Sequence, residues 1–257
     1  MTAPDADRRV ALVTGGSRGI GRALVTGLLD DGYVVYFCGR DANRARAVAD
    51  DLTAAHPERV VADALDLADA DEAYRYGRSV VERAGRVDVL INNAGVGLFG
   101  AVDAIDPEDW HRLWSINVHA PFHLLRAIAP GMRSRRSGWV VNIASLAGRH
   151  AFANGGAYCA SKAALLAWSE SAMLDLRADG VRVVSVLPGS VATHFSAPDR
   201  AGASVSDADA WKLRSEDVSD AVRDLLRHAP RALPSVLELR PTLTAAMYKA
   251  QQERGES

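Results

Sequence analysis

VALVTGGSRGIG, residues 10–21, is the stretch that decides the fold. Val10–Val13 is a short run of β-prone apolar residues, so it predicts a strand. The glycine turn Thr14–Gly21 follows directly, and a helical pattern runs from about Gly19 to Asp30. Glycines permit a tight turn and close approach of the backbone to a pyrophosphate, and the helix N-terminus favours the anion. The segment therefore indicates the first strand–turn–helix unit of a dinucleotide-binding sheet.

The same alternation of strand and helix continues along the chain. Further strands are predicted at Val34–Cys38, Val60–Leu65, Val87–Ile91, Trp139–Ile143, Val181–Val186 and Val236–Leu239. Helices are predicted at Arg44–Ala55, Ala70–Ala84, Pro107–Arg135 with a bend near Pro121, Ala157–Arg177 and Val218–Leu226. Apolar strands that alternate with helices predict an α/β fold, a Rossmann-like doubly wound parallel sheet of about seven strands with helices on both faces. We expect residues 1–257 to form a single domain, with a substrate lid at 190–212, where the sequence has no clear period.

Composition excludes several classes of function. The chain has 257 residues and a formal net charge of −2, which offers no argument for a nucleic-acid partner or an anionic membrane. No apolar run approaches the ~20 residues of a membrane span, and the N-terminus has no apolar signal core. Cys38 and Cys159 form no motif, which fits two buried thiols in a reducing compartment. We therefore expect a cytoplasmic protein without nucleic-acid or membrane partners.

Tyr158 and Lys162 stand four residues apart in YCASK, so they share one face of a predicted helix. A free tyrosine has a pKa near ~10, and a neighbouring cation is the obvious source of a lower one. Lys162 is one of only three lysines, with Lys212 and Lys249, in an otherwise arginine-based chain. Taken alone, the pair favours a half-buried tyrosine and a lysine that reaches to solvent. Together with the glycine turn, it indicates an acid–base pair.

The cofactor preference is read at the end of the second predicted strand. A unit that binds NAD places an acidic residue about twenty residues after the glycines, to bind the ribose 2′-hydroxyl. Here that neighbourhood holds Gly39 and Arg40, and Arg18 lies within the glycine turn. Because guanidinium groups pair with phosphate, the two arginines favour NADP(H) over NAD. The alternative is that both are solvated surface arginines.

Further motifs follow one another in a characteristic order. They are TGGSRGIG at 14–21, Asp66 in LDL, NNAG at 92–95, Asn117 in SINV, Ser145 in NIAS, YCASK at 158–162, and PG at 188–189 with Thr193. By this ordered set the chain resembles the compact, single-domain branch of the short-chain dehydrogenase/reductase family over nearly its whole length. LELRPT near the C-terminus resembles the closing strand of ketone reductases and 3-oxoacyl-carrier-protein reductases of that family.

The resemblance implies a role for each catalytic candidate. Tyr158 would donate a proton to a carbonyl oxygen, and Ser145 would hydrogen-bond that oxygen. Lys162 would bind the nicotinamide ribose and lower the Tyr158 pKa, and Asn117 would hold a water that links Lys162 to solvent. Bland alternatives are a polar helix residue for Asn117, a strand-end cap for Ser145 and a helix N-cap for Asp66. The residues expected to contact NADP(H) are Gly15, Ser17, Arg18, Gly19, Ile20, Gly21, Arg40, Asp66, Leu67, Asn93, Ala94, Gly95, Tyr158, Lys162, Pro188, Gly189, Val191 and Thr193.

The expected function is NADP(H)-dependent reduction of a small-molecule ketone to a secondary alcohol, or the reverse. One alternative is reduction of a 3-oxoacyl thioester on an acidic acyl carrier protein. That carrier would dock on the arginines at the end of the long helix, Arg126, Arg133, Arg135 and Arg136. A non-catalytic NADP-binding regulator is disfavoured because Ser145, Tyr158 and Lys162 are all present. A nucleotide-sugar epimerase would carry GxxGxxG, and a serine hydrolase GxSxG, and neither matches here.

A histidine pair, two apolar helices and several pocket candidates give three further expectations. His119 and His123 are one helical turn apart without a matching third ligand, so we expect no metal site. The helices Pro107–Arg135 and Ala157–Arg177 carry more apolar residues than one sheet face needs, and in the resembling family they pair between subunits, so we expect a homodimer or homotetramer. Pocket candidates are Val96–Phe99, Leu146–His150, Phe152, Phe195 and Trp211. They indicate a mixed apolar pocket and leave open a polyketide-like ketone, a sugar ketone, a steroid or a thioester.

Overall fold

The computed structural model describes residues 8–193 and 209–254. In this part of the chain the strands form one seven-stranded sheet with the order β3-β2-β1-β4-β5-β6-β7, and every pair is parallel. The strands are β1 Val10–Thr14, β2 Val34–Gly39, β3 Val60–Ala64, β4 Val89–Asn92, β5 Gly138–Ile143, β6 Val181–Pro188 and β7 Val236–Leu239. The strand order reverses between β1 and β4, and ligands of such sheets bind at the carboxyl ends of the strands at this point.

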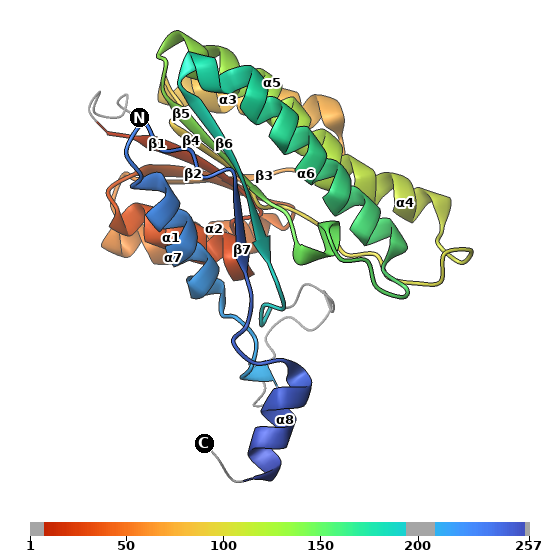
Figure 1. Cartoon of the computed structure of the whole chain (residues 1–257). Helices are drawn as coiled ribbons and strands as arrows, with labels where there is room; N and C mark the ends of the chain where they lie inside the picture. The colour runs from red at the N-terminus through yellow and green to blue at the C-terminus, as the bar shows by residue number, and fades with distance from the viewer. Residues whose placement is uncertain (1–7, 194–208, 255–257) are drawn as a thin grey trace.

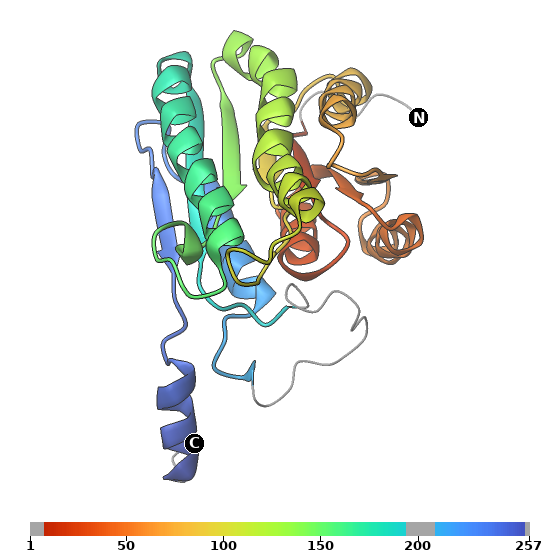
Figure 2. The same cartoon turned by 90° about the vertical axis from the view of Figure 1, so that its right-hand side faces the viewer.

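Helices cover both faces of the sheet (Figures 1 and 2). Helices α1, α2 and α7 pack on one face, and α3, α5 and α6 pack on the other. The helices are α1 Gly19–Asp30, α2 Ala42–Ala55, α3 Ala70–Ala84, α4 Pro107–Trp114, α5 Ala120–Ser134, α6 Gly156–Leu176, α7 Ser215–Leu226 and α8 Ala245–Glu253. Three short turns, η1 Ser115–His119, η2 Leu146–Gly148 and η3 Arg177–Asp179, complete the described elements. The predicted Rossmann-like α/β fold is confirmed.

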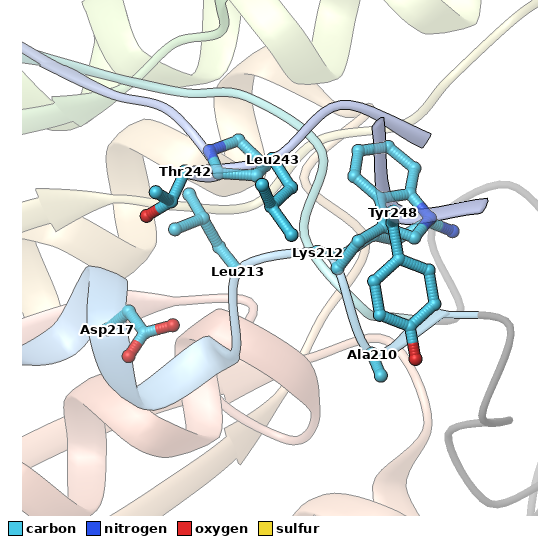
Figure 3. Close-up of a pocket in the computed structure, with 9 residues that line it drawn as sticks. Ala210, Lys212, Leu213, Asp217, Thr242, Leu243 and Tyr248 are labelled. Atoms are coloured by element: carbon cyan, nitrogen blue, oxygen red, sulfur yellow. The ribbon is translucent and has the colours of Figure 1, made fainter. Parts of the chain in front are cut away.

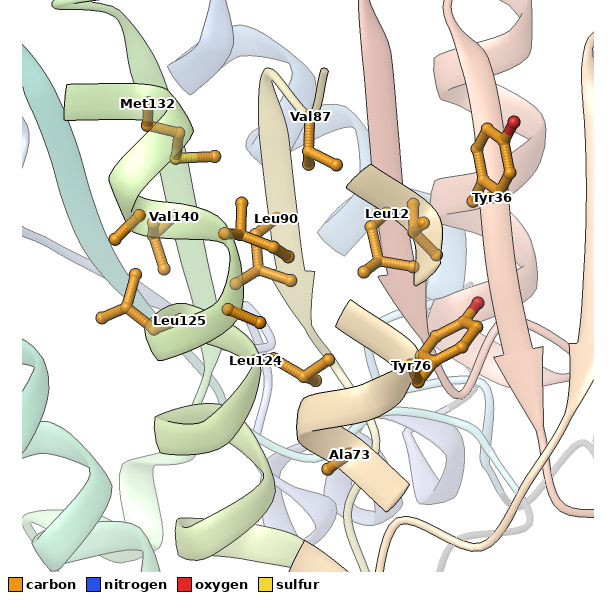
Figure 4. Close-up of a cluster of buried hydrophobic side chains, with 14 of the residues drawn as sticks. Leu12, Tyr36, Ala73, Tyr76, Val87, Leu90, Leu124, Leu125, Met132 and Val140 are labelled. Atoms are coloured by element: carbon orange, nitrogen blue, oxygen red, sulfur yellow. The ribbon is translucent and has the colours of Figure 1, made fainter. Parts of the chain in front are cut away.

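The core has two halves because successive side chains of a strand point to opposite faces. In β1, Val10 and Leu12 face the α3/α5 side, whereas Ala11 and Val13 face the α1/α7 side. All four are at most 1% exposed, which explains why the strand is apolar throughout. Figure 4 shows the α3/α5 half, where Leu124 of α5 packs beside strand side chains. Truncating such a leucine to alanine costs about 2–5 kcal/mol.

Most element bounds agree with the sequence patterns. Strand β4 is an exception, because it begins at Val89 and not at Val87. At this boundary the Asp88 carboxylate accepts a 2.8 Å hydrogen bond from the Val10 N–H, and the Asp88 N–H donates to the Val10 carbonyl at 2.8 Å. Helix α8 was not predicted, although Thr244 caps it by accepting a hydrogen bond from the Met247 N–H. The helix buries no residue and projects from the rest of the chain (Figures 1 and 2).

The predicted long helix Pro107–Arg135 is interrupted. It consists of α4, a π-helical turn at Ser115–His119, and α5. Pro121 has no N–H to bond to the carbonyl four residues earlier, on Asn117, so a regular α-helix would leave that carbonyl without its donor. In the wider turn the Ala120 N–H donates to the Ser115 carbonyl, five residues back. The predicted bend near Pro121 is therefore a wider turn, which carries Asn117 at its centre.

The described residues bear on three possible partners, namely a membrane, a metal ion and a carrier protein. Within residues 8–193 and 209–254, no helix is long and apolar enough to cross a membrane. Over the same ranges, no cluster of three or more His, Cys, Asp or Glu side chains is arranged to hold a metal ion. The four arginines proposed to dock a carrier each contact their own chain. Arg126 lies over the Tyr74 ring, Arg133 pairs with Asp179, Arg135 donates to the Val87 carbonyl and Arg136 donates to the Ala178 carbonyl.

Candidate active site

The glycine turn is held against the end of β4. The Thr14 hydroxyl accepts hydrogen bonds from the N–H groups of Asn93 and Ala94, at 3.0 and 2.9 Å. The Asn93 amide donates to the Thr14 carbonyl at 2.9 Å. A Cβ at Gly21 would lie 2.0 Å from the Gly15 carbonyl oxygen and 2.5 Å from the Asn93 Nδ2 atom. Only glycine therefore allows helix α1 to begin this close to the sheet.

This turn fits the pyrophosphate of a dinucleotide. Gly15 and Gly19 have φ angles of 68° and 53°, the left-handed region that glycine adopts without strain. Arg18 is the N-cap of α1, and its side chain makes no capping hydrogen bond. The first N–H groups of α1 are thus not bound by a capping side chain, and the helix dipole favours an anion beside them. A Cβ would fill the space beside Gly15, Gly19 and Gly21, so the glycines present here suit the pyrophosphate of a dinucleotide.

Three arginines gather beside the turn and the end of β2. The pKa of Arg18 lies below its ordinary value, first because of partial burial and then because of the positive charges of Arg44 and Arg40. Arg18 therefore lies within electrostatic range of both Arg40 and Arg44. The Arg44 Nε atom lies 3.9 Å from an Asp41 carboxylate oxygen, which offsets part of the charge. The remaining excess of positive charge suits a phosphate.

The ends of β2 and β3 hold the other predicted adenine-side residues. A Cβ at Gly39 would lie 2.8 Å from the Ser17 hydroxyl, so the Ser17 side chain packs closely against this glycine. The Asp66 carboxylate accepts a 2.7 Å hydrogen bond from Arg112 of α4. Burial alone would raise the pKa of Asp66, but the hydrogen bonds from Arg112 and a backbone N–H outweigh it and hold the pKa below its ordinary value. Leu67 is 7% exposed and its side chain belongs to the core, so only a small part of it is accessible.

Ser145, Tyr158 and Lys162 meet at the carboxyl end of β5. Ser145 follows the strand and caps η2 by accepting a 3.1 Å hydrogen bond from the Ala147 N–H. Its hydroxyl also shares a hydrogen bond with the Tyr158 hydroxyl. Helix α6 presents Tyr158 and Lys162 on one face, and the Lys162 Nζ atom lies 5.8 Å from the centroid of the Tyr158 ring. Lys162 is 4% exposed and donates a 2.9 Å hydrogen bond to the Ile143 carbonyl.

The protonation of this group follows from burial. Burial raises the pKa of Tyr158, and the hydrogen bond from Ser145 offsets only part of that rise. Burial also lowers the pKa of Lys162 from 10.5 to about 8. The net direction for Tyr158 is thus opposite to the one expected from the resemblance. The physical reason is that removing the phenol from water disfavours phenolate, while Lys162 lies over the ring and is bonded to a backbone carbonyl.

Asn117, in the π-helical turn, links the β4 loop to α6. Its Oδ1 atom accepts from the Val96 N–H at 2.9 Å, and its Nδ2 atom donates to the Val96 carbonyl at 3.0 Å. The side chain is 1% exposed, so these bonds satisfy an amide that would otherwise be costly to bury. A Cβ at Gly95 would lie 3.3 Å from this Oδ1 atom and 3.5 Å from the Lys162 Nζ atom. Gly95 therefore keeps open a space that faces both side chains.

The segment after β6 closes over the glycine turn. Pro188 ends the strand, and the Gly189 N–H donates to the Leu239 carbonyl at 2.8 Å. Val191 pairs with Leu213 in an isolated bridge. The Thr193 methyl group lies 3.3 Å from where a Cβ of Gly19 would stand. The predicted nicotinamide-side residues thus return to the same edge of the sheet as the glycine turn. Residues 194–208 of the expected lid, with Phe195, lie outside the described residues.

A cavity of about 270 Å³ lies next to this segment (Figure 3). Its lining comes from Ala210–Leu213, Asp217, Pro241–Leu243 and Tyr248. It includes Trp211 among the predicted pocket residues but none of Ser145, Tyr158 or Lys162. The cavity is therefore separate from the cluster of Ser145, Tyr158 and Lys162.

Two residues that sequence reasoning did not assign join the site. The Ser161 hydroxyl donates to the Tyr158 carbonyl at 2.8 Å and accepts from the Asn117 Nδ2 atom at 3.0 Å. Its position inside YCASK, three residues after Tyr158, was a readable signal. Arg112 binds Asp66 from α4, and no sequence pattern connects these two positions.

The fold and the site together define an α/β dinucleotide-binding protein with a Ser–Tyr–Lys cluster at the carboxyl edge of its sheet. The model of the short chain dehydrogenase family matches residues 9–204. Sorbitol dehydrogenase of Cereibacter sphaeroides is 36% identical over 186 residues, which cover 72% of this chain and 71% of that protein. The chain belongs to the short-chain dehydrogenase family and is an oxidoreductase.

Solved structures agree with the family. A metagenomic short-chain oxidoreductase in complex with NADP has a TM-score of 0.79 and 38% identity, and the match covers 91% of this chain and 98% of that one. An alcohol dehydrogenase from the archaeon Thermococcus sibiricus, complexed with 5-hydroxy-NADP, has a TM-score of 0.84 and 27% identity, with 93% and 98% covered. The family and the fold predicted from the sequence are thereby confirmed.

Proposed function

We propose that this oxidoreductase uses NADP(H) to reduce a ketone to a secondary alcohol, or catalyses the reverse reaction, with Tyr158 as the proton donor. The observation that carries the proposal is the cluster at the end of β5, where Ser145 hydrogen-bonds Tyr158 and Lys162 lies over its ring. NADPH, when bound, supplies a hydride to the carbonyl carbon. The Tyr158 proton goes to the carbonyl oxygen as the C=O π bond opens, so the product gains one hydride and one proton.

The pKa directions suit the reductive direction. A raised Tyr158 pKa keeps the phenol protonated near neutral pH, which is the form that a proton donor needs. Ser145 is placed to donate to the oxygen on which negative charge develops. The Lys162 ammonium is anchored on the Ile143 carbonyl, and its remaining protons are available for ribose hydroxyls. In the reverse direction the phenol must first lose its proton, so oxidation should be favoured by higher pH.

Support for NADP(H) comes from charge. Arg18 senses the charges of Arg40 and Arg44 at the end of β2, where dinucleotide-binding folds hold the adenine ribose, and Gly39 offers no carboxylate there. The two solved relatives above were crystallised with NADP or a derivative of it. We propose that Arg18 and Arg40 bind the 2′-phosphate, while Gly15, Gly19 and the N-terminus of α1 bind the pyrophosphate.

The test is a panel of ketones and alcohols followed by NADPH absorbance, including a carrier-bound 3-oxoacyl thioester to examine that alternative. Tyr158→Phe keeps the ring and removes the hydroxyl, so kcat should fall at least ~10²-fold, the scale of general acid catalysis. NADPH affinity should be nearly unchanged. The matched control is Tyr74→Phe. Tyr74 lies on α3 and its ring packs under Arg126 of α5, so this variant should keep wild-type turnover. A Tyr158→Phe variant with wild-type turnover would remove the proton donor from the proposal.

We further propose that the chain works as a homodimer or homotetramer in a reducing cytoplasm. Phe122 of α5 and Leu174 of α6 are 46% and 56% exposed, on the helices predicted to pair. On α4 and α5, the Trp114 Nε1 and His123 Nδ1 atoms are buried without a hydrogen-bond partner among the described residues. Covering these helices with a second copy would bury the apolar side chains.

A further inference from the structure

Two phenylalanine rings lie in succession beside the Tyr158 ring. Phe99 comes from the loop after β4, and its ring centroid lies 5.5 Å from that of Tyr158 with an interplanar angle of 60°. Phe152 comes from the loop between η2 and α6, and its centroid lies 6.2 Å from that of Phe99. Both separations are within the range of favourable ring contacts. The three rings therefore form one aromatic surface, in which Phe99 lies next to the ring that carries the Tyr158 hydroxyl.

The two phenylalanines are unusually exposed for their chemistry. Phe99 is 43% exposed and Phe152 is 50% exposed, so about half of each residue is accessible to solvent. Adjacent exposed apolar side chains beside a reaction centre indicate a surface that a ligand covers, because covering them is favourable by about 25 cal/mol per Å².

The rings are held in place before any ligand arrives. The Gly100 N–H donates to the Asn154 carbonyl at 2.8 Å, which ties the two loops together (Figure 2). The Phe152 ring lies against Gly155, where a Cβ would come within 2.5 Å of its Cε2 atom. Asn154 adopts a φ of 61°, a conformation that few residues other than glycine tolerate. A backbone constrained in this way fixes the ring positions and lowers the entropy cost of binding.

Charged side chains near the same loops are bonded to one another. Arg149, which follows η2, and Arg240, which follows β7, both bind the Glu238 carboxylate. Two guanidinium groups share one carboxylate, so one positive charge remains in excess beside the aromatic surface.

We propose that Phe99 and Phe152 form a specificity wall that selects carbonyl substrates with a flat aromatic substituent next to the carbonyl group. The inference rests on the proposed function and names its substrate class. An aryl substituent that contacts these rings would lie beside the Tyr158 ring, so its adjacent carbonyl oxygen could reach the Tyr158 and Ser145 hydroxyls. A puckered saturated ring of similar size cannot lie flat against the same surface.

The experiment compares acetophenone with cyclohexyl methyl ketone, which have the same carbon skeleton. For each enzyme the ratio of the two kcat/KM values is measured with NADPH, and each variant ratio is divided by the wild-type ratio, which cancels the intrinsic reactivity of the ketones. Phe99→Leu and Phe152→Leu keep an apolar side chain and remove the flat ring. Each should lower the aryl preference by about two- to tenfold, through a higher KM for acetophenone.

Two glycine variants test the position of the Phe152 ring while Phe152 itself is kept. Gly155→Ala pushes the Phe152 ring aside and should reduce the aryl preference as Phe152→Leu does. Gly156→Ala is the control, since a Cβ there meets nothing within 4 Å, and it should keep the wild-type ratio. Because Gly155 is also the N-cap of α6, thermal melting of both variants shows whether they fold alike.

Binding separates this inference from the proposed function. Saturation-transfer NMR on the inactive Tyr158→Phe variant with NADP⁺ measures acetophenone binding without turnover. Stronger binding of acetophenone than of the cyclohexyl ketone, lost when Phe152→Leu is added, supports the wall even if neither ketone is reduced. Equal binding of the two ketones, or a ratio unaffected by all three wall variants, overturns it, even if other ketones are good substrates.

Discussion

Replacing Lys162 by methionine should remove the stability cost of burying its ammonium group and should also reduce activity. The side chain is 4% exposed, and burial lowers its pKa from 10.5 to about 8. Between these two pH values the unfolded chain binds a proton that the folded chain has lost, so the free energy of unfolding of the wild type rises with pH. At about 1.4 kcal/mol per pKa unit, the total rise is about 3 kcal/mol. Below pH 8 both states carry the charge, and the folded state bears the full cost of burying it.

The assay is urea denaturation followed by tryptophan fluorescence from pH 7 to 10.5, at one protein concentration. Lys162→Met cannot titrate, so the wild type should gain about 3 kcal/mol relative to this variant across the range. The variant should also lose activity, since the ribose-binding ammonium is gone. Lys249→Met, at a side chain 80% exposed, is the control and should change stability by no more than ~0.5 kcal/mol. A difference between wild type and Lys162→Met that is constant with pH, or that moves the other way, would refute the reasoning.

Three further outcomes are expected. Arg40→Ala should lower kcat/KM with NADPH about ten- to a hundredfold, because it removes a charge-assisted hydrogen bond to the 2′-phosphate. The kcat/KM with NADH should barely change, and an equal loss for both cofactors would show that Arg40 is only surface charge. Gly21→Ala should destabilise the fold by about 1–3 kcal/mol in thermal or urea melts and abolish NADPH binding, since its Cβ would meet the Gly15 carbonyl at 2.0 Å; unchanged binding by fluorescence titration contradicts this role of the glycine turn. Light scattering at micromolar concentration should give a dimer or tetramer that Phe122→Glu dissociates, and a monomeric wild type would remove the proposed assembly.

Much of the fold could be predicted because its local signals agree with its tertiary environment. Helices α1 and α3 and strand β7 occupy the predicted residues, since period, turn chemistry and burial all favour the same bounds there. The glycine turn is readable for the same reason. Gly15, Gly19 and Gly21 are required by backbone geometry and close packing, and both leave a direct mark on the sequence.

The sequence alone determined the family and the order of the strands along the chain, and it named the candidate side chains of the site. The tertiary structure decided how those side chains behave. The direction of the Tyr158 pKa depends on how much water surrounds the phenol, and the pKa of Lys162 on the absence of water around its ammonium group. Other features also arise only when distant segments meet. They are the ion pair of Asp66 with Arg112, the π-helical turn at Asn117 and the ring contacts from Tyr158 to Phe152. Sequence patterns report local periodicity, whereas solvation and contact between distant residues exist only in the folded chain.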